Sequence, residues 1–440
     1  MHAMLQVSGN PDLFSVVLHP AFIVFLAVYA LIVLRNLGRV NLPVWTVMFA
    51  GAVAMLFLNG ISLKTAYAAI NLDVVFFLIG MFSIVSGMEA SGLLRYITIR
   101  LLRLAGTPER VMLFILVALG TISAFLMNDT VAVVATPIVI GVAHEMRIRP
   151  TPLLISLAFA VSIGSVMTPM GNPQNLLVAL DSGMNSPVLE FLRLLGPPTL
   201  INFVLTYYLL KLYYKRDLSA ADPPRDLKLD EAITDLRLAK TTGLVAALTI
   251  AGFFALSIVQ VFGVNTDLNF GSIALLGSAV LYTASPRRRE IIRGVNWSII
   301  LFFISMFIVM QAVWDAGLIN LFASYMPPLN HSDSPANIMN IVGVSVLMSQ
   351  LMSNVPFVAV YVNLMKSLGF GLLDTKAWLA LAGGSTLAGN LTILGAASTI
   401  IILEAAEEKG HTFSFYEYLK IGSMVTLVNV TVLILWLTYA

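Results

Sequence analysis

The sequence predicts an all-α polytopic membrane protein with two inverted repeats of five transmembrane helices, each repeat carrying a re-entrant helical hairpin and a broken helix. Two observations lead to this fold class. Of the 440 residues, 58% are hydrophobic and only 11% are charged, with a mean hydropathy of +0.90. That is too little polar surface to cover a water-soluble globule of this size. In addition, one stretch of the chain occurs twice, which indicates an internal structural repeat.

The repeated stretch comprises residues 71–94 and 296–319. The identical residues, all at one spacing, are Asn71 and Asn296, Phe77 and Phe302, Met81 and Met306, Phe82 and Phe307, and Gly92 and Gly317. Further along, Asn128 aligns with Asn354, and TPMGNPQN (residues 168–175) aligns with TILGAAST (residues 392–399). We therefore predict a first repeat over residues 1–214, a linker over residues 215–240 and a second repeat over residues 241–440.

Apolar runs of about the 17–25 residues that a helix needs to cross a bilayer supply the individual spans. They lie near residues 20–36, 43–59, 72–92, 190–213, 243–262, 269–284, 295–315 and 415–438. One interrupted apolar segment in each half completes the set, giving spans 1–5 in the first repeat and spans 6–10 in the second.

Loop charges indicate the topology, because Lys and Arg concentrate in cytoplasmic loops. Residues 111–146 begin and end beside basic loops, so both ends are expected on the cytoplasmic side and the segment must turn back at Asn128 and Asp129. Its counterpart, residues 338–368, is expected to turn at Ser353 and Asn354 from the opposite side. Five spans per half then make the repeats inverted, the linker cytoplasmic and both termini external. We expect a multi-pass protein of a bacterial or archaeal cytoplasmic membrane.

Four short segments interrupt the apolar helices: MNDT (127–130), TPMGNPQN (168–175), MSNVP (352–356) and GNLTILGAAST (389–399). Broken helices at membrane depth are tolerated only where protein or a wet cavity satisfies the backbone. The free N–H groups at helix starts can hold an anion or a hydroxylated solute, and free C=O groups can coordinate Na⁺. The candidate binding residues are Asn128, Asp129, Thr130, Thr168, Gly171, Asn172, Asn175, Ser353, Asn354, Gly389, Asn390, Thr392, Gly395 and Ser398.

Asp129 is the sharpest single candidate. A carboxylate at membrane depth costs at least about 2.5–3.5 kcal/mol, so it must be protonated, paired or next to a cation. Its symmetry partner is Val355, which favours one site for Na⁺ or H⁺, with Asn128 and Asn354 as further ligands. The alternative is that Asp129 only caps the second hairpin helix.

The same sequence excludes several classes of chemistry. It contains no cysteine, which removes disulfides, thiolate metal sites and thiol catalysis. Its five histidines lie in termini or loops, so no metal site is expected. The nucleotide-binding pattern GxxxxGK[ST] is missing, so energy must come from an ion gradient or from a separate ATPase subunit. We expect no enzyme activity, no cofactor and no nucleic-acid partner.

The interrupted segments, and in particular SAFLMNDTVAVVATP, MTPMGNPQNL and LAGNLTILGAAS, resemble the ion transporter superfamily. This group contains arsenite/antimonite permeases, plant silicon efflux transporters, citrate permeases, sodium/proton antiporters of the NhaD type and sodium:dicarboxylate symporters. The nearest resemblance is to the arsenite-permease and silicon-efflux branch. It implies an elevator-type transporter, a homodimer, and solute and ion contacts from the motif residues given above. The sodium:dicarboxylate branch has Ser-Asn-Thr at both hairpin tips, which this chain lacks.

These observations predict a secondary transporter for a small inorganic oxyanion or metalloid oxyacid, coupled to H⁺ or Na⁺. No Lys or Arg lies in any of the four segments, which suits a neutral hydroxylated solute such as arsenous or silicic acid. The alternative is a Na⁺/H⁺ antiporter or a sodium-coupled di- or tricarboxylate symporter on the same scaffold, because backbone N–H groups can hold carboxylates unaided. Membrane lipid is the remaining expected partner.

Overall fold

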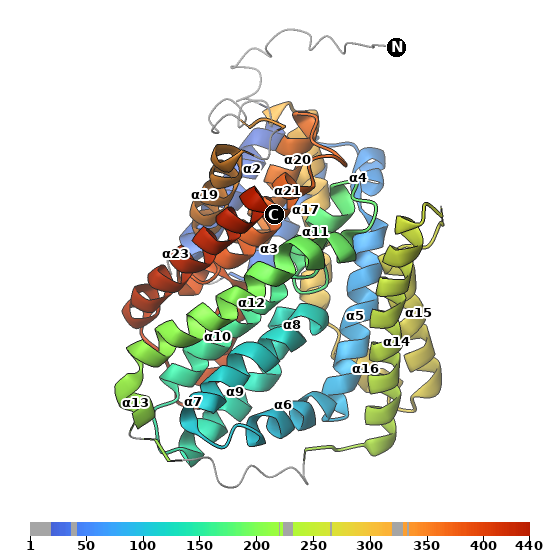
Figure 1. The fold of residues 1–440 in the computed structure, drawn as a ribbon. Coiled ribbons are helices and arrows are strands. Elements are labelled where there is room, and N and C mark those ends of the chain that lie inside the picture. The colour runs from blue at the N-terminus through green and yellow to red at the C-terminus, as the bar shows by residue number, and fades with distance from the viewer. Residues whose placement is uncertain are drawn as a thin grey trace. The chain divides into compact units, whose positions relative to one another are not determined.

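The computed structural model describes residues 19–36, 42–219, 221–222, 232–264, 266–318, 329–331 and 334–440, and this part of the chain is helical without strands (Figure 1). Each apolar run predicted from the sequence forms a helix there. The all-α prediction is therefore confirmed. The predicted external N-terminus and residues 220 and 223–231 of the predicted linker lie outside the described residues.

The chain forms two compact units, and each unit draws on both halves of the sequence. Unit 1 comprises Met1–Leu72, Trp297–Pro328 and Ala359–Gly369; unit 2 comprises Asp73–Asn296, Leu329–Val358 and Phe370–Ala440. The compact units thus cut across the two repeats, so they do not test the division that we predict at residues 215–240.

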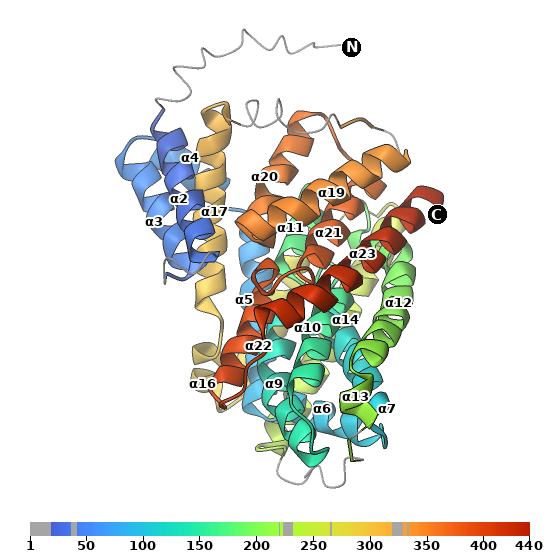
Figure 2. The same cartoon turned by 90° about the vertical axis from the view of Figure 1, so that its left-hand side faces the viewer.

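Unit 1 is a small group of helices built around α17 (Trp297–Asp315). This helix packs along α3 (Val44–Phe57) and also contacts α2 (Pro20–Asn36) and α4 (Leu63–Ala69), as Figure 2 shows. Gly51 allows α2 and α3 to approach closely, because a Cβ atom there would lie 2.3 Å from Cγ2 of Val28.

Unit 2 holds most of the remaining helices. They are α5 (Leu72–Ala90, from its second residue), α6 (Leu93–Arg103), α7 (Pro108–Phe114), α8 (Gly120–Leu126), α9 (Asn128–Glu145), α10 (Thr151–Ser165), α11 (Pro173–Asp181), α12 (Pro187–Tyr213), α13 (Lys215–Ser219), α14 (Leu236–Val261), α15 (Phe270–Ala284), α16 (Arg288–Arg293), α19 (Pro335–Met352), α21 (Thr375–Ala388), α22 (Ala397–Glu407) and α23 (Phe415–Tyr439).

Hairpin 1, as we call residues 108–145, has the helix-turn-helix form that the sequence predicts. Thr107 caps α7 and Pro108 stands at its first position, where a missing N–H costs nothing. A π-helical stretch, η1 (Ile115–Leu119), leads into α8. The turn itself is one residue, Met127, with a φ of +66°, and α9 begins immediately after it. A left-handed φ is uncommon for a residue other than glycine, and it marks a strained position.

Hairpin 2, as we call residues 335–367, repeats that turn. It consists of α19, the single residue Ser353 with a φ of +67°, and α20 (Asn354–Ser367). The boundary between the two units falls inside α20, between Val358 and Ala359, so the tip of hairpin 2 belongs to unit 2.

Both broken helices are also present. The first is α10 and α11, separated by residues 166–172, which we call the first break. The second is α21 and α22, separated by residues 389–396, the second break, which contains the short 3₁₀ turn η2 (Ile393–Gly395). In each case glycine, proline or asparagine stands where regular helical hydrogen bonding stops.

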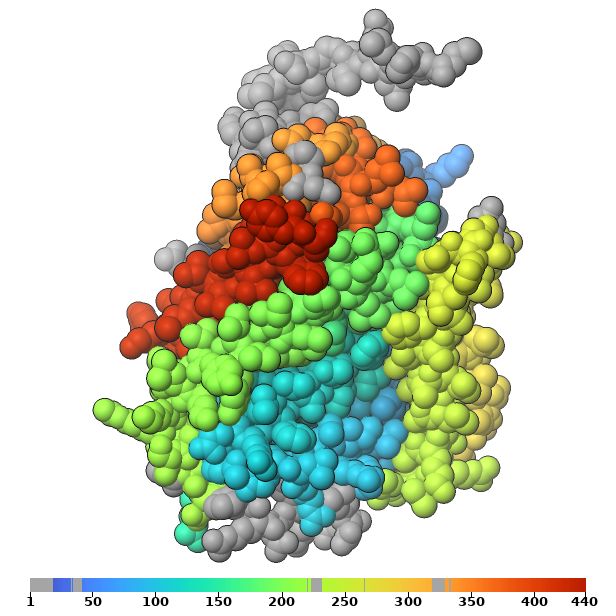
Figure 3. All heavy atoms as spheres, viewed as in Figure 1, coloured from blue at the N-terminus to red at the C-terminus, as the bar shows by residue number. Residues whose placement is uncertain are grey.

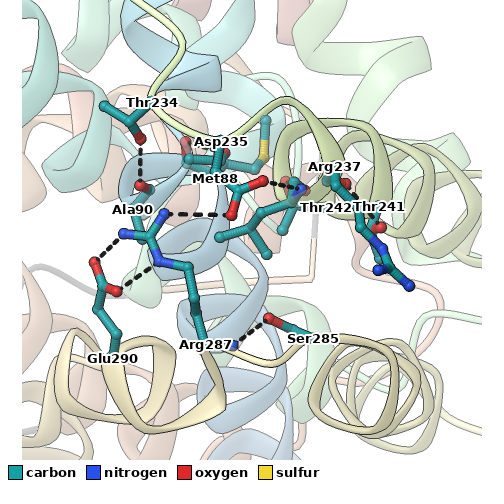
Figure 4. Close-up of polar contacts among 12 residues, drawn as sticks. Met88, Ala90, Thr234, Asp235, Arg237, Thr241, Thr242, Ser285, Arg287 and Glu290 are labelled. Carbon is teal, nitrogen blue, oxygen red and sulfur yellow. Dashed lines mark hydrogen bonds and ion pairs between the residues drawn. The ribbon is translucent and has the colours of Figure 1, made fainter.

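The end of the predicted linker is anchored to unit 2 by polar contacts (Figure 4). The carboxylate of Asp235 accepts a hydrogen bond from the third N–H group of α14 at 2.9 Å and forms an ion pair with Arg287 at 3.6 Å. Arg287 also binds Glu290 at 2.6 Å, and the hydroxyl of Thr234 donates to the carbonyl of Ala90 at 2.9 Å. The backbone hydrogen bond, followed by the Arg287 charge, lowers the pKa of Asp235, and the hydrogen bond from Arg287 lowers the pKa of Glu290.

Apolar side chains cover the outside of the long helices. On unit 2, α12, α14 and α23 form much of the face seen in Figure 3, and they expose Leu200, Leu212, Leu244, Leu248 and Leu427 by more than half. Within the described ranges, seven helices are long and apolar enough to cross a membrane, and four shorter helices are also apolar. A surface of this kind is stable against lipid rather than water, so this is a multi-pass integral membrane protein.

Candidate functional site

The tip of hairpin 1 is joined to the first break by two hydrogen bonds. The backbone N–H of Asn128 donates to the carbonyl of Gly171 at 2.9 Å, and the hydroxyl of Thr168 donates to the carbonyl of Ala124. Glycine is required at position 171, because a Cβ atom there would lie 2.4 Å from the carbonyl oxygen of Ser165. Three predicted site residues, Asn128, Thr168 and Gly171, are therefore brought together.

Two asparagine side chains hold the first break in shape. Asn172 caps α11 by accepting from the N–H of Asn175 at 2.8 Å, and its amide donates to the hydroxyl of Ser165 at 3.1 Å. The amide of Asn175 donates to the carbonyls of Ser165 at 2.9 Å and Thr168 at 3.2 Å. These contacts satisfy carbonyls that the interrupted helix leaves free. Both candidate binding residues thus make hydrogen bonds that hold the first break in shape, Asn172 from its last position and Asn175 from the first turn of α11.

Thr386 joins the two broken helices. Its hydroxyl donates to Oδ1 of Asn175 at 3.0 Å and accepts from Nδ2 of Asn172 at 3.2 Å. Its carbonyl accepts from the hydroxyl of Ser162 at 3.1 Å. Thr386 lies in the last turn of α21, directly before the second break. One residue of the second half therefore completes the hydrogen bonding of the first.

Gln350 of α19 ties hairpin 2 to the second break. Its Nε2 donates to the carbonyl of Ala388 at 2.8 Å, and its Oε1 accepts from the hydroxyl of Thr392 at 2.7 Å. Gly395 lies against this amide, because a Cβ atom there would be 2.9 Å from Oε1. Gly389 is close to the far side of the same break, since its Cβ atom would meet that of Ala396 at 2.7 Å.

Several buried polar atoms at the tip of hairpin 2 and at the second break have no hydrogen-bond partner in the described part of the chain. They are Oδ1 of Asn354, both side-chain atoms of Asn390 and the hydroxyl of Ser398. Native proteins leave few such groups unsatisfied, because each costs about 1–3 kcal/mol. All three residues were predicted as binding residues. Within the described part of the chain, their side chains therefore carry free hydrogen-bonding atoms.

Asp129, Thr130 and Ser353 are half-buried at the two hairpin tips. The carboxylate of Asp129 accepts no hydrogen bond from the described residues, and α9 begins without a side-chain cap. Instead, Oδ1 of Asn128 accepts from the N–H of Asp129 at 2.9 Å. No hydrogen bond among the described residues supports the alternative that Asp129 caps the helix. The position of Asp129 in the first turn of α9 is favourable for a negative charge.

Sequence reasoning missed Thr386 and Gln350. The available signal was weak, since each is one of several polar residues in its helix and lies a few positions outside a predicted segment. Ser165, which accepts from both asparagines of the first break, was missed for the same reason.

Comparison with known proteins gives a consistent picture. A family model described as "Citrate transporter" matches residues 29–383. The chain is 31% identical over 435 residues to the uncharacterized transporter Mb2703 of Mycobacterium bovis, covering 95% of this chain and 98% of the relative. It is 26% identical over 433 residues to the silicon efflux transporter LSI3 of Oryza sativa subsp. japonica, covering 86% and 89%.

Among solved structures, the YdaH transporter of Alcanivorax borkumensis has a similar fold. The TM-score is 0.52 at 14% sequence identity, and the match covers 96% of this chain and 98% of that one. At this level of identity the likeness concerns the fold alone. The sequence-based resemblance to the ion transporter superfamily is confirmed by the family match and by the relatives.

Proposed function

Because the chain belongs to the citrate transporter family, a family of membrane transporters, we propose that it is a secondary active transporter for a small inorganic oxyanion or metalloid oxyacid, coupled to H⁺ or Na⁺. The observation that carries this proposal is the set of buried, unpartnered polar atoms on Asn354, Asn390 and Ser398. They offer hydrogen bonds but no charge.

The charge of the site favours a neutral or weakly charged solute. None of the four interrupted segments contains Lys or Arg. A multiply charged anion would thus depend on helix N-termini and a co-bound cation, whereas arsenous or silicic acid needs only donors and acceptors. The similarity to a silicon efflux transporter agrees with this choice.

Asp129 is the proposed coupling residue. Its carboxylate stands at the start of α9 without a hydrogen-bond partner among the described residues, and position 355 in the second half is valine. We assign it H⁺ or Na⁺ binding, with Asn128 and Asn354 as neighbouring ligands. H⁺ exchange would give efflux of the solute, and Na⁺ cotransport would give uptake.

The mechanism and assembly that we propose follow the superfamily resemblance. We propose elevator-like alternating access in a homodimer. A separate ATPase subunit is the alternative source of energy, because the chain lacks a nucleotide-binding loop of its own.

A second candidate is a sodium-coupled di- or tricarboxylate symporter, or a Na⁺/H⁺ antiporter on the same scaffold. The description of the matched family, "Citrate transporter", favours the carboxylate. The N–H groups at the starts of α9, α11, α20 and α22 are the donors that such an anion would use.

Flux measurements in proteoliposomes separate these candidates. Purified protein is reconstituted, and arsenite, silicate, citrate and sodium movement are followed under imposed pH or Na⁺ gradients. We expect gradient-driven metalloid flux and little citrate flux. Citrate flux without metalloid flux would replace the first candidate by the second, and sodium moving against protons without either solute would indicate the antiporter.

A further inference from the structure

We propose that the tip of hairpin 2, and not that of hairpin 1, opens to admit the solute, and that Gln350 is the positioning residue that holds this tip closed on the second break. The identity of what enters rests on the proposed function. The difference between the two hairpins rests on hydrogen bonds and on one close backbone contact.

Hairpin 1 lies directly on its broken helix, backbone against backbone. A Cβ atom on Gly164 of α10 would be only 1.9 Å from the carbonyl oxygen of Gly120 in α8. No side chain separates the two helices at this point. Four residues after Gly120, the carbonyl of Ala124 accepts directly from the hydroxyl of Thr168. The contact between Gly120 and Gly164 cannot open by rotating a side chain.

The aligned positions of the second half are filled differently. Asn128 aligns with Asn354 and Thr168 with Thr392, so Ala124 corresponds to Gln350 and the glycine pair corresponds to Val346 and Ala388. Here Nε2 of Gln350 donates to both of those carbonyls, at 3.2 Å and 2.8 Å. Thr392 donates to Oε1 of the same amide instead of to the backbone. One half-buried amide thus replaces a direct backbone contact.

The tip of hairpin 1 is also bonded more directly to its break than the tip of hairpin 2. The N–H of Asn128 donates to the carbonyl of Gly171 at 2.9 Å, and its Oδ1 accepts from the next N–H of α9. The aligned residue Asn354 makes no such bond to Gly395 in the described part of the chain, and its buried Oδ1 has no partner. Hairpin 1 is therefore tied to the first break at its tip, whereas hairpin 2 is tied to the second break only one turn earlier.

At the tip itself, one backbone hydrogen bond ties hairpin 1 to the first break, and among the described residues none ties hairpin 2 to the second break. The Gln350 amide can exchange its partners by rotating, and the strained Ser353 turn stands next to Asn354, whose buried Oδ1 has no partner among the described residues. When the tip moves away, the unpartnered atoms of Asn354, Asn390 and Ser398 become reachable, which links this motion to the proposed site.

Cysteine labelling tests the difference without knowledge of the solute, because the natural chain contains no cysteine. The turn residues are replaced one at a time, Ser353→Cys and Met127→Cys, in the full-length protein. The rate of reaction with N-ethylmaleimide is measured in detergent and divided by the rate in denatured protein, so that each turn serves as the control for the other.

Each cysteine variant is then combined with Gln350→Ala, Thr392→Val or Thr168→Val. Gln350→Ala is expected to raise the labelling rate of Ser353→Cys by about tenfold, and Thr392→Val is expected to raise the same rate by about threefold. These factors correspond to the loss of two neutral hydrogen bonds and of one, respectively. Neither should change the Met127→Cys rate, and Thr168→Val should leave both rates within about twofold because the backbone bond of Asn128 remains.

An unchanged Ser353→Cys rate in Gln350→Ala would overturn the proposal, as would an equal rise at Met127, which would indicate general loosening. Should Gln350→Ala fail to fold, Thr392→Val decides by the same criterion. Failure of solute flux with the expected labelling would contradict only the proposed function, and the reverse result only this inference.

Discussion

The first hairpin reaches its broken helix through backbone atoms at Gly120 and Gly164, whereas α19 reaches the second break through the side chain of Gln350. Both hairpins use the same strained one-residue turn, at Met127 and Ser353. The duplicated halves therefore share their backbone design and differ in what holds that design together. A direct backbone contact favours rigidity, and a side-chain contact favours a local opening.

Adding a methyl group at the first interface should have the largest effect. In Gly164→Ala the new Cβ atom would lie 1.9 Å from the backbone of Gly120, which cannot yield without moving a helix. We expect a loss of about 2–3 kcal/mol in unfolding free energy, measured by thermal or chemical unfolding in detergent. Gly141→Ala is the matched control, because its Cβ atom would meet nothing within 4 Å and alanine favours the helix. Equal stability of the two variants would contradict the close contact.

Removing the joint between the two breaks should cost somewhat less. Thr386→Val keeps the shape of the side chain but leaves Asn172 and Asn175 each short of one partner in a buried place. We expect a loss of about 1–3 kcal/mol, and Thr386→Ser should recover most of it. The exposed Thr283→Val change serves as control. If valine and serine at 386 behaved alike, the hydroxyl would have no part in joining the halves.

The chemical inequality of the hairpin tips is tested at Asp129, which aligns with Val355. Asp129→Asn should abolish the dependence of transport on pH or Na⁺ while leaving thermal stability nearly unchanged, because its carboxylate makes no hydrogen bond with the described residues. Flux is measured against pH and Na⁺ in proteoliposomes, with Asn363→Ala of hairpin 2 as a control for unspecific effects. A variant that keeps the pH and Na⁺ dependence of the natural protein would leave Asp129 without a coupling role.

The smallest effect is expected outside both hairpins, at the contacts of Arg287 with Asp235 and Glu290. Both carboxyl groups have a lowered pKa in the folded protein. Their contribution to stability is therefore present above the ordinary carboxyl pKa of about 4 and is lost as the pH falls through the lower folded value. Arg287→Gln should change the unfolding temperature only slightly at pH 7. It should also flatten the stability profile below about pH 4, measured by thermal unfolding over a pH series. An unaltered acid profile would argue against the ion pairs.

Much of the fold was predictable from the sequence because interruptions in apolar helices are costly and therefore visible. The first break was predicted from Gly171, Asn172 and Pro173, and the tip of hairpin 2 was predicted from Ser353 and Asn354. The side-chain hydrogen bonds that connect the helices around each break were not predictable. Thr386 lies more than 200 positions from Asn172 and Asn175, and a single threonine before a break carries no sign of its partner.

The two compact units could not be predicted either. Each combines chain segments from both repeats, and α20 crosses from one to the other. Apolar periodicity gives the length of a helix but not its neighbours, because a helix in lipid is apolar on every side.

The hydroxyl of Thr386 has a consequence for how a duplicated protein comes to have one site. Gene duplication by itself yields two independent broken helices, each free to shift when something binds beside it. The Thr386 hydroxyl at the end of α21 donates a hydrogen bond to Asn175 and accepts one from Asn172, so a displacement of the first break strains a contact with the helix that leads into the second. The two duplicated broken helices are thereby coupled to one another.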